Sequence, residues 1–144
     1  MTEPAYQITP SLWQGAMGPV ARYWPSYEPH VDALVVMAPW VELIPAKVVY
    51  YYPIDDNDQG LPTDEFRRLS EFLRCVPRRH QKIMTICHMG ENRSGLASAL
   101  YLIHRGATVD EAIRLIRNHV MPRSGQPYTL WNPGFVAQLH REFP

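Results

Sequence analysis

Short apolar runs along the chain predict the strands of a sheet. Residues 31–38 (VDALVVMA), 47–54 (KVVYYYPI) and 82–87 (KIMTIC) are rich in β-branched and other apolar residues, a pattern typical of strands buried on both faces. Residues 7–16 (QITPSLWQGA) predict two short strands separated by a turn. Proline recurs within residues 17–30 (MGPVARYWPSYEPH), so we expect an irregular segment there with one broken helix.

Later segments have the periodicity of helices. Apolar residues recur at helical spacing on one face of 64–75, whereas 94–105 is nearly apolar on all sides, as in a central buried helix. The sequence Thr-Val-Asp-Glu at 108–111 is a capping box, which begins a helix that runs to about residue 118. Asparagine followed by proline at 132–133 begins a last helix, which runs to about residue 143.

Strands that alternate with helices predict an α/β fold, with a central, mostly parallel sheet flanked by helices. The length of 144 residues is most simply that of a single domain over residues 1–144. The longest apolar runs are far shorter than the roughly 20 residues of a membrane-spanning helix. The first residues, MTEPAYQITPSLW, lack the basic and apolar regions of a secretory signal. We therefore expect no membrane association.

Charge and cysteine content narrow the class of protein further. The 14 basic and 14 acidic residues balance, which disfavours a dedicated nucleic-acid-binding protein. Two cysteines, Cys75 and Cys87, cannot form a disulfide scaffold, and their spacing suits no zinc site. We expect reduced thiols and a cytoplasmic location. The sequence leaves the oligomeric state open.

The candidate chemistry lies where the third apolar run ends, in the sequence IMTICHMGENRSG. A strand followed by a turn and a helix places Cys87 at the C-terminal edge of a parallel sheet, where such folds bind their ligands. We expect the P-loop, residues 88–93, to curl with its amides inward, with Gly90 providing the unusual backbone angles. The following helix directs its N-terminus at the same point.

This arrangement predicts a phosphate site made by the whole loop. The guanidinium of Arg93 can hold two phosphate oxygens at once. The positive field of the loop favours the thiolate of Cys87, the nucleophilic form of cysteine. A nucleophile inside a phosphate site indicates phosphoryl transfer through a cysteinyl-phosphate. The predicted phosphate-binding residues are His88, Met89, Gly90, Glu91, Asn92 and Arg93.

The segment resembles the active site of the protein tyrosine phosphatase superfamily, whose pattern is cysteine, five residues, arginine, then serine or threonine. CHMGENRS matches this pattern at Cys87, Gly90, Arg93 and Ser94. The similarity extends to the compact, atypical dual-specificity branch of the superfamily, through its general-acid loop, an early strand and the closing helix. The corresponding residues here are 52–57 (YPIDDN), 11–15 (SLWQG) and 132–139 (NPGFVAQL).

The resemblance implies a cysteine-dependent protein phosphatase that needs no metal or cofactor. Its substrates would be phosphotyrosine and, in a shallow cleft, phosphoserine or phosphothreonine. Cys87 would be the nucleophile, and Arg93 would hold the phosphoryl group. Asp56, thirty-one residues before the cysteine, would be the general acid, with Asp55 and Asp58 as competitors. Ser94 would donate a hydrogen bond to the sulfur, although serine is also a common helix cap.

Two departures from the family pattern keep a different function open. The family usually has histidine before the cysteine, where this chain has Ile86, and Glu91 brings a negative charge into the P-loop. We expect Glu91 to point outward, away from a bound phosphate. The chain could instead be a non-catalytic phosphate-binding pseudophosphatase.

The loop and its flanking residues disfavour enzymes with non-protein substrates. Enzymes acting on phosphoinositides or RNA 5′-phosphates usually carry extra lysines in this loop, and this loop has none. Arg93 and Ser94, together with the upstream aspartate, fit a sulfurtransferase poorly. Residues 121–131 are long enough to form part of a substrate rim. His88 could contact the substrate or be solvated, and Cys75 could be a resolving thiol or a half-buried helical one.

Overall fold

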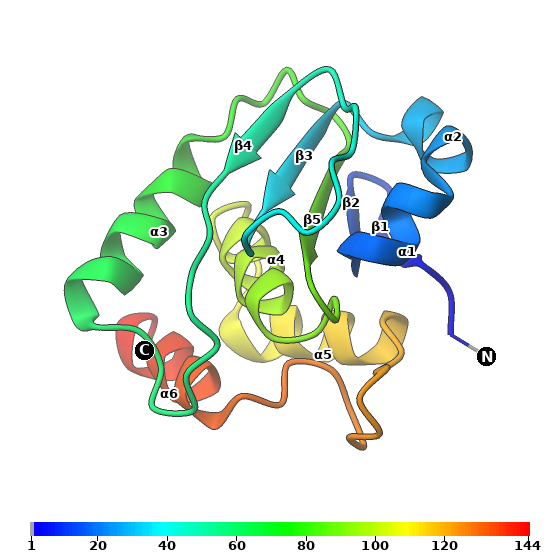
Figure 1. Ribbon diagram of the computed structural model, residues 1–144. Helices are drawn as coiled ribbons and strands as arrows, with labels where there is room; N and C mark the ends of the chain where they lie inside the picture. Colours follow the sequence, from blue (N-terminus) through cyan, green and yellow to red (C-terminus); the bar gives the residue numbers. More distant parts are fainter. Residues whose placement is uncertain (1) are drawn as a thin grey trace.

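The computed structural model describes residues 2–144, so Met1 of the predicted domain lies outside the described residues. Its sheet has five strands in the order β1-β2-β5-β3-β4 (Figure 1). Strand β1 pairs with β2 antiparallel, and the other three pairs are parallel. The predicted mostly parallel α/β sheet is confirmed. The strands are β1 (Ala5–Thr9), β2 (Leu12–Ala16), β3 (Ala33–Val36), β4 (Val49–Tyr51) and β5 (Ile83–Cys87).

The helices are α1 (Met17–Arg22), α2 (Trp24–Tyr27), the short 3₁₀ turn η1 (Glu28–His30), α3 (Thr63–Cys75), α4 (Arg93–Ile103), α5 (Val109–His119) and α6 (Pro133–Glu142). Residues 17–30 are thus more helical than predicted. Pro25 and Pro29 lie in the first turns of α2 and η1, where a backbone N–H has no helical partner and proline is tolerated. Helix α1 packs against β2, and in the view of Figure 1 α3 lies at the left, α4 in the centre, and α5 and α6 at the bottom.

Strand β4 is shorter and more exposed than the sequence predicts. Only Val49–Tyr51 pair, and they pair on one side alone, because β4 is the edge strand. Val49 is 36% exposed and Tyr51 is 48% exposed. Trp40 stacks on Tyr51 with ring centroids 5.8 Å apart, so the segment after β3 partly covers this edge. Tyr51 therefore packs against a loop, whereas Tyr50 packs on Phe72 of α3.

The predicted starts of α5 and α6 are confirmed. The hydroxyl of Thr108 accepts a hydrogen bond from the backbone of Glu111, whose carboxylate accepts one from the backbone of Thr108. The side chain of Asn132 accepts a hydrogen bond from the N–H of Phe135 at 3.1 Å. These contacts satisfy backbone donors that the first helical turn leaves free.

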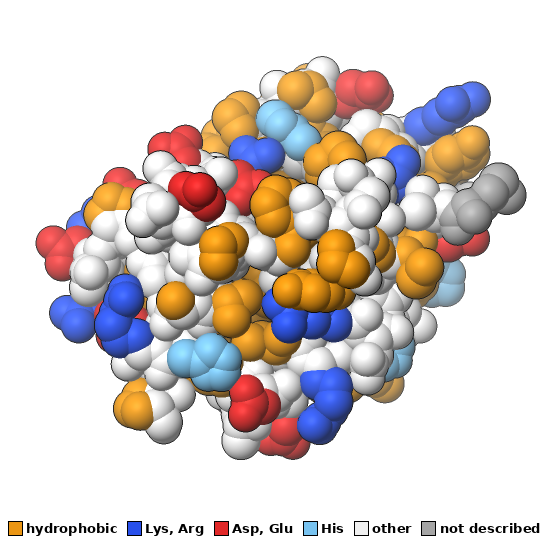
Figure 2. Space-filling model, turned by 90° about the horizontal axis from the view of Figure 1, so that it is seen from below, with side chains coloured by type: hydrophobic (Ala, Val, Ile, Leu, Met, Phe, Trp, Pro, Cys, Tyr) orange, Lys and Arg blue, Asp and Glu red, His pale blue; other side chains and the backbone are white. Residues whose placement is uncertain are grey.

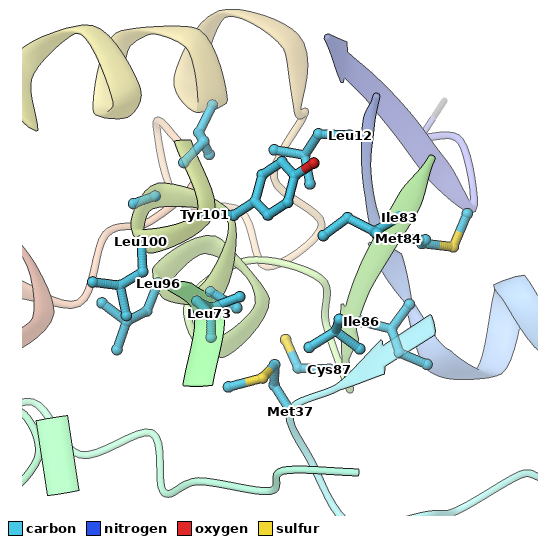
Figure 3. Close-up of a cluster of buried hydrophobic side chains, with 14 of the residues drawn as sticks. Leu12, Met37, Leu73, Ile83, Met84, Ile86, Cys87, Leu96, Leu100 and Tyr101 are labelled. Carbon is cyan, nitrogen blue, oxygen red and sulfur yellow. The ribbon is translucent and has the colours of Figure 1, made fainter. Parts of the chain in front are cut away.

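The core forms between the sheet and α4. Every residue of β5 is buried, and α4 is buried from Ser94 to Leu102. Helix α4 packs on β5 and β2 and lies against α3 and α5. Figure 3 shows this cluster, in which Ile83, Ile86 and Leu96 lie among the buried side chains, together with Cys87. Within residues 2–144, no helix combines the length and the apolar character needed to cross a bilayer.

Candidate active site

Cys87 is the last residue of β5, which lies between β2 and β3 in the parallel part of the sheet. It is 2% exposed. Its Sγ lies 3.2 Å from the Oγ of Ser94, in the first turn of α4. The core thus fixes the cysteine on one side, and the start of α4 fixes its sulfur on the other.

The turn after Cys87 depends on Gly90, which has a φ of +74°. A Cβ at this position would lie 2.7 Å from the carbonyl carbon of Gly15, closer than any side chain can approach. The Nε2 of Gln14 donates a hydrogen bond to the carbonyl oxygen of Gly90 at 2.9 Å. The P-loop therefore rests directly on the end of β2, and a side chain at residue 90 would displace it.

The P-loop leaves its own backbone donors free. Within residues 2–144, no N–H group of residues 88–93 donates a hydrogen bond to another group of the protein. The Nε of Arg93 is also buried without a partner, and its guanidinium forms no ion pair within the described residues. Buried polar groups are normally paired, so unpaired donors concentrated at one loop indicate a place for an oxyanion.

A cavity of about 610 Å³ opens beside the loop. His88 is held at it by a 3.0 Å contact between its Nε2 and the carbonyl oxygen of Pro39. Figure 2 views the protein from the side toward which β3 and β5 run, and hydrophobic side chains gather across the middle of this face. The cavity is lined by Pro39, Tyr52, Pro53, Ile54, Asp55, Glu65, Arg68, His88 and Arg93.

Two charged residues of the cavity were not predicted from the sequence. Glu65 and Arg68 lie on α3, one helical turn apart, and both face the cavity. The available signal for Glu65 and Arg68 was the position of α3 a few residues after the segment 52–57, and its polar face opposite Phe66 and Leu69. Met89, predicted to bind phosphate, is 45% exposed, and its side chain does not line the cavity.

The three candidate general acids differ in position. Asp55 lines the cavity. Asp56 lies against the P-loop: its Oδ2 accepts a hydrogen bond from the Nδ2 of Asn92 at 3.2 Å, and its Oδ1 accepts one from the Nδ2 of Asn132 at 2.7 Å. Asp58 is exposed, and its Oδ1 accepts a hydrogen bond from the Nε2 of its neighbour Gln59 at 3.5 Å. The sequence reasoning identified Asn132 as a helix cap and missed this second role.

Glu91 points away from the cavity, as expected, but it does not reach solvent. It is 1% exposed, and its carboxylate accepts hydrogen bonds from the segment between α5 and α6. That segment holds the back of the P-loop and contributes no residue to the cavity. The prediction that residues 121–131 form a substrate rim is therefore wrong for this cavity. Cys75 is exposed on α3 and not half-buried.

The sequence matches one protein family over most of its length. The family described as dual specificity phosphatase, catalytic domain, matches residues 44–142, which include the general-acid loop, the P-loop and α4 to α6. The chain belongs to this family. No curated protein matches the chain in sequence.

Solved phosphatase structures share the fold of this dual specificity phosphatase domain. Human DUSP28 superposes with a TM-score of 0.75 at 19% identity, covering 99% of this chain and 95% of the other. OH1 from the Orf virus, a tyrosine phosphatase of triple substrate specificity, has a TM-score of 0.70 at 18% identity, covering 99% and 89%. The human tyrosine phosphatase-like serine/threonine/tyrosine-interacting protein has a TM-score of 0.69 at 16% identity, covering 96% and 94%. At these identities the similarity shows the fold alone.

Proposed function

We propose that the chain hydrolyses phosphotyrosine, and phosphoserine or phosphothreonine, in protein substrates through a cysteinyl-phosphate. One observation carries the proposal. The sulfur of Cys87 lies at the base of a loop whose N–H groups, together with the Nε of Arg93, have no partner within residues 2–144. A phosphoryl group needs such donors around its oxygens, and a nucleophile below its phosphorus.

In the first step the thiolate of Cys87 attacks phosphorus. A sulfur–phosphorus bond forms, the phosphorus–oxygen ester bond breaks, and the leaving oxygen takes a proton from the Asp56 carboxyl. The guanidinium of Arg93 and the N–H groups of the P-loop stabilise the charge on the phosphoryl oxygens. The product alcohol then leaves, and the phosphate remains on the sulfur.

In the second step water attacks the cysteinyl-phosphate. Asp56, now a carboxylate, takes a proton from the water, and a phosphorus–oxygen bond forms as the sulfur–phosphorus bond breaks. The Oγ of Ser94, 3.2 Å from the sulfur, donates a hydrogen bond that stabilises the departing thiolate. Inorganic phosphate is released, and Cys87 and Asp56 return to their starting forms.

The choice of Asp56 over Asp55 rests on its fixed position. The amide side chains of Asn92 and Asn132 orient the Asp56 carboxylate against the P-loop. Asp55 lines the cavity, and within residues 2–144 its carboxylate forms no such hydrogen bond to residues 88–93. A general acid acts best when it is held at a defined point near the leaving group. Asp55→Asn is therefore a matched control for Asp56→Asn.

Hydrolysis of an aryl phosphate tests the proposal. We expect turnover by the wild type, none by Cys87→Ser, and a fall of about 10²–10⁴-fold in kcat for Asp56→Asn. Asp55→Asn should change kcat by less than about tenfold. Undiminished turnover in Cys87→Ser would overturn the mechanism, and a larger loss in Asp55→Asn than in Asp56→Asn would reverse the assignment of the acid.

The composition of the cavity favours protein substrates. Arg68 and Arg93 line it together with Asp55 and Glu65, so its charges balance. A site for inositol polyphosphates or RNA 5′-phosphates would need an excess of positive charge. Equal or faster hydrolysis of such an ester than of a phosphotyrosine peptide would contradict this choice.

A phosphate-binding module without catalysis is the second candidate, because Ile86 stands where the family usually has histidine. The charge of Glu91 no longer supports this candidate, because its carboxylate does not line the cavity. This candidate predicts that Cys87→Ser keeps phosphopeptide affinity, and that the wild type shows no turnover between about pH 5 and pH 8. Detection of phosphocysteine would exclude it.

A further inference from the structure

Glu91 is a buried carboxylate without a cation. Within residues 2–144, no Lys, Arg or His lies within ion-pair distance of it, and it is 1% exposed. Burial of a lone charge is costly unless hydrogen bonds compensate it. The compensation therefore has to come from neutral donors around the carboxylate.

Those donors come from the α5–α6 connection, residues 120–132. The Oε2 of Glu91 accepts hydrogen bonds from the backbone N–H groups of Arg123 at 3.1 Å and Ser124 at 3.0 Å. Its Oε1 accepts from the Oγ of Ser124 at 2.6 Å and from the Nε1 of Trp131 at 3.0 Å. Hydrogen bonds to an ionised acceptor are roughly twice as strong as neutral ones.

The next residue of the P-loop continues the contact. The Oδ1 of Asn92 accepts a hydrogen bond from the N–H of Asn132 at 2.8 Å, so two consecutive residues of the P-loop bind two consecutive residues of the connection. The connection is itself fixed at this point. Leu130 has a φ of +57°, and Arg117 donates a hydrogen bond to its carbonyl oxygen at 2.9 Å.

We propose that Glu91 is a positioning residue for phosphate binding. Its carboxylate, by tying the back of the P-loop to the α5–α6 connection, holds residues 88–93 in the conformation that leaves their N–H groups free for an oxyanion. The inference rests on the proposed function, because it assigns a role to the phosphate site. It explains why a family member carries a negative charge in this loop: the charge serves the connection behind the loop, and the phosphate lies on the other side.

The role requires a carboxylate. Glutamine has the same size, but its NH₂ must face either the two backbone N–H groups or the indole N–H of Trp131, all of which only donate. A donor would then meet a donor in a buried place. If Trp131→Phe removes the indole donor, the glutamine NH₂ can donate to the Ser124 hydroxyl, and its oxygen can accept from the two backbone groups.

This geometry makes a test by rescue possible. Inhibition of aryl phosphate hydrolysis by inorganic phosphate is measured for the wild type, Glu91→Gln, Trp131→Phe and the double variant. We expect Glu91→Gln to raise the inhibition constant of phosphate by about tenfold or more, and Trp131→Phe alone to raise it less. The double variant should bind phosphate better than Glu91→Gln, because the two changes compensate each other.

The control separates positioning from stability alone. Thr108→Ala removes the distant capping box of α5 and should lower the Tm without changing phosphate inhibition. A Glu91→Gln variant with a lowered Tm and the wild-type inhibition constant would overturn the proposal, as would a double variant no better than Glu91→Gln. Should Glu91→Gln not fold, Trp131→Phe and Ser124→Ala must each weaken phosphate inhibition for the proposal to stand.

Failure of the proposed function gives a different result. A wild type that neither hydrolyses the ester nor binds phosphate would remove the phosphate site itself, and with it the role of Glu91. If the wild type binds phosphate without turnover, the role of Glu91 is tested on the same four proteins, with phosphate affinity measured directly by calorimetry in place of the inhibition constant. Only a difference between variants and wild type tests Glu91.

Discussion

The P-loop and the α5–α6 connection are neighbouring irregular segments that differ in whether their polar groups are hydrogen-bonded. Within residues 2–144, the N–H groups of residues 88–93 and the Nε of Arg93 have no partner. In the connection, by contrast, the carbonyl oxygens of Thr129 and Leu130 accept hydrogen bonds from Arg117 of α5 at 3.1 and 2.9 Å, and the guanidinium of Arg117 lies 4.0 Å from the ring centre of Tyr128.

The contrast indicates that hydrogen-bond donors have different roles in the two segments: ligand binding in the P-loop and stability in the connection. Unpaired buried donors cost stability, so a fold leaves them unpaired where a ligand supplies the acceptors. The connection instead has two of its carbonyl groups paired with Arg117 of α5 and supplies donors to Glu91. We expect changes in the P-loop to act on turnover, and changes in the connection to act first on stability.

The largest effect should come from Arg93→Ala. Loss of its guanidinium removes the main positive charge from the phosphate site and should lower kcat/KM for an aryl phosphate by about 10³-fold or more. The Tm should change little, because the side chain forms no ion pair within residues 2–144. Steady-state kinetics and thermal unfolding check both parts. A large fall in Tm with turnover intact would reverse the contrast.

Gly90→Ala should be the most destabilising single change in the P-loop. The new Cβ would meet the backbone of Gly15 at 2.7 Å, which adds overpacking to the strain of a positive φ, together about 3 kcal/mol or more. Gly125 in the connection is a matched control, since its φ is +85° and nothing lies within 4 Å of an added Cβ.

Gly125→Ala should accordingly cost only about 1–2 kcal/mol, the strain of the left-handed backbone alone. Denaturant unfolding measures both variants. Equal losses of unfolding free energy would show that the P-loop is not seated on β2 as tightly as these distances indicate.

Arg117→Lys tests the connection. Lysine keeps the charge but cannot donate to two carbonyl oxygens in a plane, so we expect a loss of about 1–3 kcal/mol in unfolding free energy. Turnover should fall by less than about tenfold, through loosening of the connection that holds Glu91. A variant with wild-type stability and a large loss of kcat would place Arg117 in the catalytic machinery, against this account.

The smallest effect concerns the pH dependence of stability, away from both segments. Burial lowers the pKa of His104 below its ordinary 6.5, although Ser70 lies in hydrogen-bond contact at 2.9 Å. Between the folded and the unfolded pKa of His104, the unfolded chain binds more protons than the folded one. The contribution of His104 to the unfolding free energy is therefore lost as the pH falls from about 7 through the folded pKa.

We expect the effect of His104 on the unfolding free energy to be small, because its imidazole is partly exposed to solvent. The difference between the unfolding free energies at about pH 7.5 and pH 5.5 should be smaller in His104→Gln than in the wild type. An identical pH dependence in the two proteins would show that this histidine contributes nothing to it.

Local pattern predicted much of this molecule. The apolar periodicity identified β5 and α4, and the capping box at Thr108 identified the start of α5. The pattern overestimated the length and burial of β4, because an apolar run does not reveal whether a strand will lie at the edge of the sheet. It favoured Asp56 among the acids of the DDND sequence but kept Asp55 and Asp58 as competitors, because local pattern does not specify how a loop folds against the rest of the chain.

The contacts behind the P-loop were beyond local reasoning. Glu91 meets Trp131, and Asn92 meets Asn132, across forty residues of chain. Such pairs depend on how helices α4 to α6 pack, which the periodicity of each helix alone does not specify. The sequence indicated that Glu91 should avoid the phosphate, but not where its charge would be satisfied.

Alkylation by iodoacetate tests the central claim most directly, with mass spectrometry reading each cysteine separately. The account predicts that Cys87 is alkylated and that inorganic phosphate slows this reaction by occupying the P-loop. Cys75, exposed on α3, is the internal control, and its rate should not respond to phosphate. A Cys87 that does not react, or that reacts at the same rate with and without phosphate, would contradict the account.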